Sequence, residues 1–201
     1  MSLINAIKRE DYELADQLIM DRHGLDETDR YGYTSLMLLL QKLQKHKVCL
    51  KLITKLIDAG AVVNVKNIYG WTVWNFAVYY DHSMYIIRMF IDAGADVNVK
   101  KDDTGWTALI YAVHQNISLH AIRVLIDTGA DVNIKNNNGS TALISVASCS
   151  NSTYTVRTLI DAGADVNIKN NNGHIALSYA ARKYRLYCFI DAVKMLIEAD
   201  F

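Results

Sequence analysis

Two series of glycines that recur with one period constrain this chain more than any other feature. The first series repeats at intervals of 34, 35 and 34 residues and consists of Gly60, Gly94, Gly129 and Gly163. The second series repeats at intervals of 38, 35, 34 and 34 residues and consists of Gly32, Gly70, Gly105, Gly139 and Gly173. A fixed period of this length is typical of solenoids, in which each repeat is one supersecondary unit. We therefore expect a stack of similar units.

Each period predicts two short helices followed by a tight hairpin. After each glycine of the second series comes an apolar segment with helical spacing, and a second such segment ends before the next Gly-Ala pair. Polar runs such as residues 135–139, Lys-Asn-Asn-Asn-Gly, lie between the two glycine series. Asn and Gly tolerate the left-handed backbone of a tight turn. One unit has too little apolar surface to fold alone, so neighbouring units must share a core.

These segments resemble ankyrin repeats, whose hallmark is G-x-T-P-L-H-x-A and then a helix ending L-L-x-x-G-A-D-V-N. Residues 105–112 read GWTALIYA, and residues 124–133 read VLIDTGADVN. The resemblance implies an all-α ankyrin-repeat solenoid of stacked helix-turn-helix units with β-hairpin-like loops. We expect a single domain over residues 1–201 that comprises an N-terminal capping pair at 2–28, full repeats at 29–66, 67–101, 102–135 and 136–169, and a C-terminal capping pair at 170–201.

Departures from the family pattern change the expected source of stability. The chain has no proline, and the histidine position of the motif holds Met37, Asn75, Ile110, Ile144 and Ser178. We therefore expect the family's Thr-His hydrogen-bond network to be missing and apolar burial to contribute more. The first unit also carries extra residues within 41–47, which lengthen either a helix or the loop that joins the pair.

The resemblance also places the binding surface. Ankyrin-type stacks usually bind protein partners on a concave surface formed by hairpin tips and the first helix of each pair. At these positions the first three full repeats carry large aromatic groups, which typify binding hot spots. The predicted partner-binding residues are Tyr31, Tyr33, Tyr69, Trp71, Tyr79, Tyr80, Trp106 and His114. Alternatively, the tryptophans pack over adjacent hairpins, and Tyr79 and Tyr80 are partly buried between helices.

Two other functions remain open. Asparagines in the V-N position of ankyrin repeats can be hydroxylated by a host asparaginyl hydroxylase, and the candidate modification sites are Asn64, Asn98, Asn133 and Asn167. The other alternative is a structural, self-associating scaffold. The recurring Asp96, Asp131 and Asp165 are expected to accept hydrogen bonds from hairpin amides instead of acting as catalytic acids.

Composition argues against several functional classes. Lys plus Arg and Asp plus Glu are both 21, so no net charge attracts nucleic acid or an anionic membrane. No apolar run approaches the roughly 18 residues that a membrane span needs. Three cysteines without C-x-x-C spacing and six histidines without paired spacing predict no metal site and free thiols that are at least partly buried. Because no phosphate-binding loop or nucleophile-base pair is present, we expect no cofactor and no enzyme activity.

The asparagine-rich, proline-free units also resemble the ankyrin-repeat proteins of giant DNA viruses. That resemblance implies a viral protein that acts in host cytoplasm on a host protein. We expect a cytoplasmic monomer with one protein partner, and the sequence does not identify that partner.

Overall fold

The computed structural model describes residues 1–80, 84–149, 152–183 and 190–199. Within these ranges it contains twelve α-helices, α1 to α12, no strand, and one isolated β-bridge between Thr28 and Thr34. The chain divides into two units, unit 1 at Met1–Asp96 and unit 2 at Val97–Phe201. The all-helical fold is therefore confirmed, whereas the single domain and its repeat boundaries stay a prediction.

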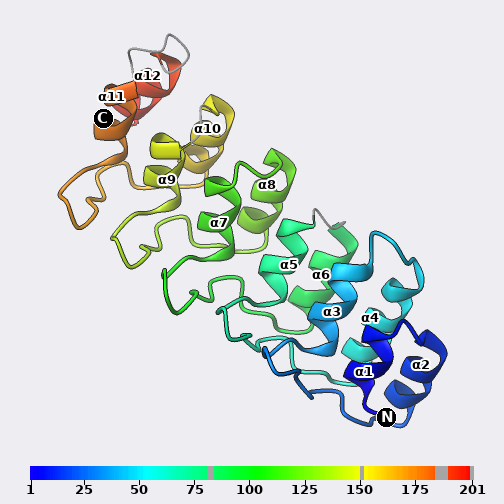
Figure 1. Cartoon of the computed structure of the whole chain (residues 1–201). Helices are drawn as coiled ribbons and strands as arrows, with labels where there is room; N and C mark the ends of the chain where they lie inside the picture. Colours follow the sequence, from blue (N-terminus) through cyan, green and yellow to red (C-terminus); the bar gives the residue numbers. More distant parts are fainter. Residues whose placement is uncertain (81–83, 150–151, 184–189, 200–201) are drawn as a thin grey trace. The chain divides into compact units, whose positions relative to one another are not determined.

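Unit 1 consists of three helical pairs. They are α1 (Leu3–Lys8) with α2 (Tyr12–Met20), α3 (Ser35–Lys42) with α4 (Val48–Asp58), and α5 (Val73–Tyr79) with α6 (Met84–Asp92). The first helix of the middle pair, α3, packs against α1 and α5, and its partner α4 packs against α2 and α6 (Figure 1). Neighbouring pairs thus share a core, as the period predicts.

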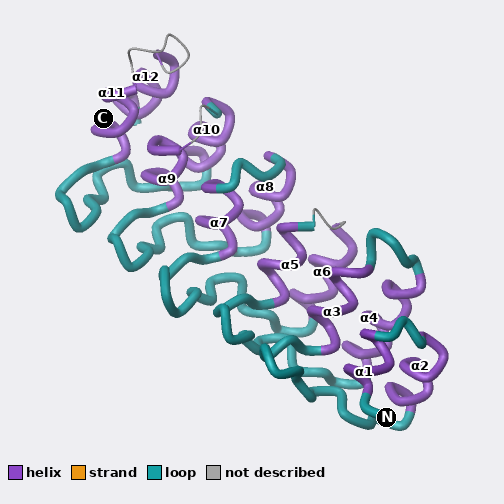
Figure 2. Tube along the Cα trace, viewed as in Figure 1, coloured by secondary structure: helices purple, strands orange, loops and turns teal. Residues whose placement is uncertain are grey.

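Unit 2 repeats this arrangement. Its pairs are α7 (Ala108–His114) with α8 (Leu119–Asp127), α9 (Ala142–Cys149) with α10 (Thr153–Asp161), and α11 (Ala176–Lys183) with α12 (Ile190–Glu198). The middle helices again lie between their neighbours, because α9 packs on α7 and α11, and α10 packs on α8 and α12. Within each unit, the long loops that connect successive pairs lie together on one side of the helices (Figure 2).

Threonines begin the first helix of several pairs. The hydroxyls of Thr34, Thr107 and Thr141 accept a hydrogen bond from the backbone N–H three residues later, at 3.2–3.3 Å. At α5 the amide oxygen of Asn75 accepts from the backbone N–H of Thr72 at 2.9 Å. At α5 a hydrogen-bonded pair of Thr72 and Asn75 therefore takes the place of the family's Thr-His network.

The extra residues of the first full repeat are divided between a helix and the loop. Helix α4 has 11 residues, whereas α6, α8 and α10 have 9 each, and residues 43–47 form the loop between α3 and α4.

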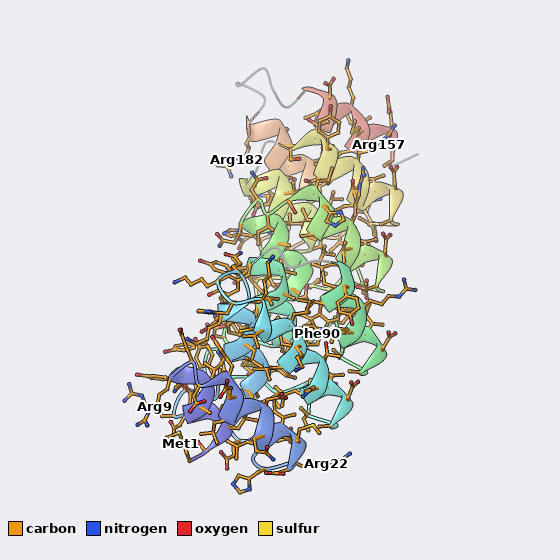
Figure 3. All side chains as sticks on the ribbon, turned by 90° about the vertical axis from the view of Figure 1, so that its right-hand side faces the viewer. Met1, Arg9, Arg22, Phe90, Arg157 and Arg182 are labelled. Atoms are coloured by element: carbon orange, nitrogen blue, oxygen red, sulfur yellow. The ribbon has the colours of Figure 1, made fainter. Side chains whose placement is uncertain are left out.

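Apolar side chains fill the space between helices in both units. In unit 1, Trp74 and Phe90 are fully buried, with ring centroids 6.3 Å apart. In Figure 3, Phe90 lies within unit 1, whereas Arg9 and Arg22 project from its surface. In unit 2, Leu125 and Leu159 are fully buried. Burial of each such side chain contributes about 1.5–3 kcal/mol, which makes the shared core the main source of stability.

Candidate protein-binding surface

Side-chain oxygens fix the hairpin loops that carry the predicted binding residues. The amide oxygen of Asn67 accepts hydrogen bonds from the backbone N–H groups of Tyr69 at 3.0 Å and Trp71 at 2.9 Å. The same pair of bonds is made in other hairpins by Asp29, Asn136 and Asn170. This role was not predicted from the sequence, where its signal is an Asp or Asn three residues before a second-series glycine.

The third full repeat departs from this pattern because its hairpin is one residue longer. Lys101 takes the place of the asparagine, and its backbone N–H donates to the carbonyl of Trp106 at 2.8 Å. The longer interval between Gly70 and Gly105 reflects this insertion.

Successive hairpin tips in unit 1 lie in contact. The backbone N–H of Ile68 donates to the carbonyl of Tyr31 at 3.0 Å. Gly32 has φ 75°, and a Cβ at this position would lie 2.9 Å from the Cα of Asn67. Only glycine combines this left-handed backbone with so close an approach. The two tips therefore place Tyr31 and Tyr69 next to one another.

Six aromatic side chains of unit 1 form what we call the aromatic surface, which consists of Tyr31, Tyr33, Tyr69, Trp71, Tyr79 and Tyr80. The ring centroid of Tyr69 lies 6.5 Å from that of Tyr31, with the planes 26° apart. It also lies 6.5 Å from the ring of Tyr33, in an edge-on arrangement. These distances are typical of favourable aromatic pairs. Side chains from two hairpins thus form one continuous patch.

The patch continues onto the C-terminal end of α5. Trp71 lies 5.9 Å from Tyr79, and Tyr79 lies 4.9 Å from Tyr80, measured between ring centroids. The buried ring of Phe76 connects the two parts of the patch, because it lies 5.7 Å from Tyr33 and 5.3 Å from Trp71. The predicted binding residues of unit 1 are therefore brought together on a shared aromatic base.

Exposure differs among these residues. Tyr31, Tyr69 and Tyr79 expose 37%, 50% and 54% of their surface, respectively. The other three are half-buried, namely Tyr33, Trp71 and Tyr80. The packing alternative therefore applies to Trp71 and Tyr80, whereas Tyr31, Tyr69 and Tyr79 present ring surface to solvent. Large exposed aromatic patches commonly mark interaction sites.

Two acidic groups of unit 1, Asp29 and Glu10, are already paired with lysines. Oδ2 of Asp29 accepts a hydrogen bond from the ammonium of Lys8 at 2.7 Å, and Oδ1 accepts from the two loop amides. Glu10 accepts from Lys42 at 2.6 Å. The hydrogen bond from Lys42 is the main cause that lowers the pKa of the Glu10 carboxyl. Both acids are consequently ionised and paired near neutral pH.

The aromatic surface also has a neighbouring cation and neutral phenol groups. The guanidinium carbon of Arg30 lies 4.5 Å from the ring centroid of Tyr31, within the range of a cation–π interaction. Burial raises the pKa of the Tyr33 phenol, with a further contribution from Tyr69, and burial likewise raises the pKa of Tyr80. These phenols therefore stay protonated and can donate hydrogen bonds.

The other two predicted binding residues belong to unit 2. The ring centroids of Trp106 and His114 lie 4.5 Å apart, and both side chains are half-buried. Trp106 also lies 6.3 Å from Tyr111 of α7. Trp106 and His114 therefore contact each other beside α7, the first helix of their repeat.

The V-N asparagines connect successive hairpins. The amide nitrogen of Asn133 donates to the carbonyl of Gly163 at 3.0 Å, and its oxygen accepts from the backbone N–H of Asp165 at 2.8 Å. Asn64 and Asn98 make the same two bonds with the next Gly-Ala-Asp turn. We call this two-bond contact the asparagine clamp. It gives three candidate modification sites a structural role that our sequence analysis did not assign.

Two of the recurring aspartates, Asp131 and Asp165, accept hydrogen bonds from hairpin amides as predicted. A carboxylate oxygen of Asp131 accepts from the backbone N–H of Asn133, and Asp165 accepts from Asn167, both at 2.8 Å. They are therefore hairpin components.

Metal-ligating residues and thiols do not form a further site within the described part of the chain. The part of the chain that the structure describes contains no cluster of three metal-ligating residues. None of its helices combines the length and apolar character that crossing a membrane requires. Cys49 is a free, buried thiol, as predicted, and burial raises its pKa. His82, Cys188 and the side chain of Cys149 lie outside the described residues.

Comparison with known proteins identifies the repeat. A family model described as ankyrin repeats (3 copies) matches residues 44–136 and 114–201. A search of curated proteins gave no match.

Solved structures with this fold align along nearly the whole chain. An ankyrin repeat domain from Acinetobacter baumannii AYE is 28% identical with a TM-score of 0.83, and the alignment covers 98% of this chain and 97% of that one. A chain from the complex of the predatory endopeptidase Bd0816 of Bdellovibrio bacteriovorus with immunity protein Bd3460 is 26% identical, with a TM-score of 0.74 and coverage of 98% and 97%. The ankyrin repeat domain of Bcl-3 shares the fold at 22% identity, with a TM-score of 0.81 and coverage of 99% and 86%. With its repeated helical pairs, stacked hairpins and matched family model, this chain belongs to the ankyrin-repeat family.

Proposed function

We propose that this chain is a protein-binding module that contacts its partner through the aromatic surface. The observation that carries the proposal is a continuous set of rings across two hairpins and the end of α5, with Tyr31, Tyr69 and Tyr79 exposed at 37%, 50% and 54%. Ankyrin repeats generally mediate protein–protein interactions. In ankyrin-type stacks, hairpin tips and first helices form the concave face. We also propose Trp106 and His114 of the third full repeat, which belong to unit 2, as partner-binding residues.

Energetic considerations support a role in binding. Each exposed ring leaves apolar area in water that a partner can cover, and truncation of such an anchor costs about 2 kcal/mol or more of binding free energy. The loops beneath the rings are fixed by the oxygens of Asp29 and Asn67, so little conformational entropy is lost when a partner binds. The similarity to a chain taken from a two-protein complex is consistent with this role.

The proposal can be tested by site-specific photo-crosslinking. A photoreactive phenylalanine analogue replaces Tyr69 in one variant and Tyr154 in a second, and each protein is exposed to extract from the cells in which it acts. Tyr154 is a suitable control because it lies on α10 in unit 2 and is 78% exposed. We expect one discrete crosslinked partner from position 69 only. Equal products from both positions, or none from position 69, would contradict the proposal.

The asparagines support a second candidate function, because Asn64 is exposed and matches the position that asparaginyl hydroxylases modify. The asparagine clamp weighs against ready access, since both ends of the amide are hydrogen-bonded. Mass spectrometry of protein made in host cells would show added oxygen on peptides that contain Asn64, Asn98, Asn133 or Asn167 if the chain is a substrate.

A self-associating scaffold is the remaining alternative and predicts a molar mass that rises with concentration in light scattering, whereas our proposal predicts a monomer. From the sequence resemblance to giant-virus ankyrin proteins, we also propose that the partner is a protein of host cytoplasm. We propose binding and no catalysis.

A further inference from the structure

We propose that the aromatic surface takes a proline-rich segment of its partner, bound in the polyproline II conformation with an acidic side chain beside the prolines. This inference rests on the proposed function and adds the chemical class of the ligand. It follows from three properties of the surface, which are the packing of its rings, its hydrogen-bonding groups and its charge.

The rings are packed against one another, so a ligand lies across them. Neighbouring ring centroids are 4.9–6.5 Å apart, which is the distance of rings in direct contact. A ligand ring or a methylated ammonium therefore has no slot between them. Tyr31 and Tyr69 lie nearly parallel on successive tips. Ring contacts through Tyr33, Phe76 and Trp71 extend this row to Tyr79 at the end of α5. A row of rings fits an extended segment better than a compact ligand.

Proline-rich segments match such a row of rings. In the polyproline II helix, which has three residues per turn, the pyrrolidine rings form ridges that pack against aromatic side chains. The conformation is largely preformed in solution, so binding to a flat surface loses little entropy. A segment that is disordered and flexible would lose more and gain no additional contact from this surface.

The hydrogen-bonding groups of the aromatic surface and of a proline-rich ligand are complementary. Proline has no N–H, so a proline-rich backbone offers only carbonyl acceptors. Tyr69 and Tyr79 are exposed, and their phenol groups can donate hydrogen bonds to such carbonyls. The carboxylate of Asp29, which would repel carbonyl oxygens, is held by Lys8. The surface thus donates where the proposed ligand accepts.

The positive charge of Arg30 determines which residue we expect beside the prolines of the ligand. Arg30 is exposed and makes no ion pair within the described part of the chain, while its guanidinium lies over Tyr31. A carboxylate beside the prolines would reach this guanidinium and form a charge-assisted hydrogen bond. A lysine at the same place would be repelled.

Synthetic peptides test the inference with the full chain. The probe is a fluorescent peptide of about ten residues, mostly proline with two glutamates, and fluorescence anisotropy reports its binding. One matched peptide carries lysines in place of the glutamates, and another carries glycine and serine in place of the prolines. We expect the proline-glutamate peptide to bind at least about tenfold more tightly than either control peptide.

Variants assign the binding to the surface. We expect Tyr69→Ala to weaken binding of the proline-glutamate peptide at least about tenfold and Tyr154→Ala to leave it unchanged. Tyr69→Phe keeps the ring and removes only the hydroxyl. A loss of peptide affinity in this variant that is measurable but smaller than in Tyr69→Ala supports a donor role for the phenol. Arg30→Ala should remove most of the preference for glutamate over lysine. Circular dichroism equal to that of the parent confirms that each variant is folded.

Three results would overturn the inference. They are equal affinity for the proline and glycine-serine peptides, loss of peptide binding in Tyr154→Ala but not in Tyr69→Ala, and tighter binding of an oligothymidylate of about ten nucleotides than of any peptide. If no peptide binds while crosslinking from position 69 still yields a partner, the polyproline inference fails and the proposed function stands. If crosslinking also fails, both are wrong.

Discussion

Replacement of Asn133 by alanine gives a direct test of the asparagine clamp. The substitution removes the donor to Gly163 at 3.0 Å and the acceptor for the Asp165 amide at 2.8 Å. A neutral hydrogen bond contributes about 1 kcal/mol net, so two bonds set an upper value of about 2 kcal/mol. Both groups are accessible to water, which replaces part of the loss. We expect the free energy of unfolding to fall by about 1–2 kcal/mol and the melting temperature by about 2–8 °C.

Urea titration measures the global effect, and hydrogen exchange measured by NMR locates it. Exchange of the Asp165 amide should accelerate in Asn133→Ala, because this amide loses its acceptor. The Asp131 amide is a matched internal control, since its acceptor is the oxygen of Asn98 at 2.8 Å and is untouched by the substitution. A second control is Asn138→Ala, because Asn138 is exposed and its side chain makes no hydrogen bond in the described structure.

The reasoning is refuted if Asn133→Ala is as stable as Asn138→Ala within a few tenths of a kcal/mol. It is also refuted if protection of the Asp165 and Asp131 amides falls equally, because the effect would then not be local.

Three other substitutions test the hairpins of unit 1. Phe76→Tyr should raise the free energy of unfolding in urea by about 1 kcal/mol, because the new phenol can accept from the buried amide nitrogen of Asn67, which has no partner; an unchanged or lower value contradicts this. Gly32→Ala should destabilise the chain more than Gly60→Ala in thermal denaturation, since both glycines have positive φ but only Gly32 lies against a neighbouring backbone. Asp29→Asn should make the stability of the chain less sensitive to acid. Despite burial, an ammonium and two backbone amides hold the pKa of the Asp29 carboxyl below 3.8 in the folded state. The contribution of this carboxylate to stability is therefore present above pH 3.8 and lost as the pH falls through the folded pKa. Equal acid dependence of the parent and this variant, in denaturation curves at several pH values, would count against that assignment.

The periodic features of the fold were predictable from the sequence because they depend on local chemistry. Glycines with positive φ mark the same turn in each period, and threonine at the start of the first helix is a favourable N-cap. Gly60 and Gly94 illustrate this, since each follows the last turn of a helix with a left-handed backbone and open space around it.

Contacts between periods were harder to predict. The asparagine clamp joins residues about 30 positions apart, such as Asn64 and Gly94, so it becomes visible only when the register of successive hairpins is known. The amide nitrogen of Asn67, which has no hydrogen-bond partner in the described part of the chain, is a further example. Its counterpart Asn170 donates to the phenol of Tyr179 at 2.8 Å, whereas the position equivalent to Tyr179 in unit 1 holds Phe76.

Grouping of the aromatic residues was partly predictable. The period placed Tyr31 and Tyr69 at equivalent positions, and the structure places their rings in contact. Sequence could not show that Phe76 connects Tyr33 to Trp71, nor that Trp71 is half-buried while Tyr79 remains exposed. These differences depend on rotamers and on packing against neighbouring rings.

The asparagine clamp also bears on how a chain of this kind changes length. Each clamp uses one amide from one repeat and one turn from the next repeat, and the same groups recur at Asn64, Asn98 and Asn133. An in-frame duplication or deletion of one entire period therefore leaves every amide facing a turn of the same kind. A lineage can lengthen or shorten its recognition surface in whole increments without leaving a polar group unsatisfied at the new junction.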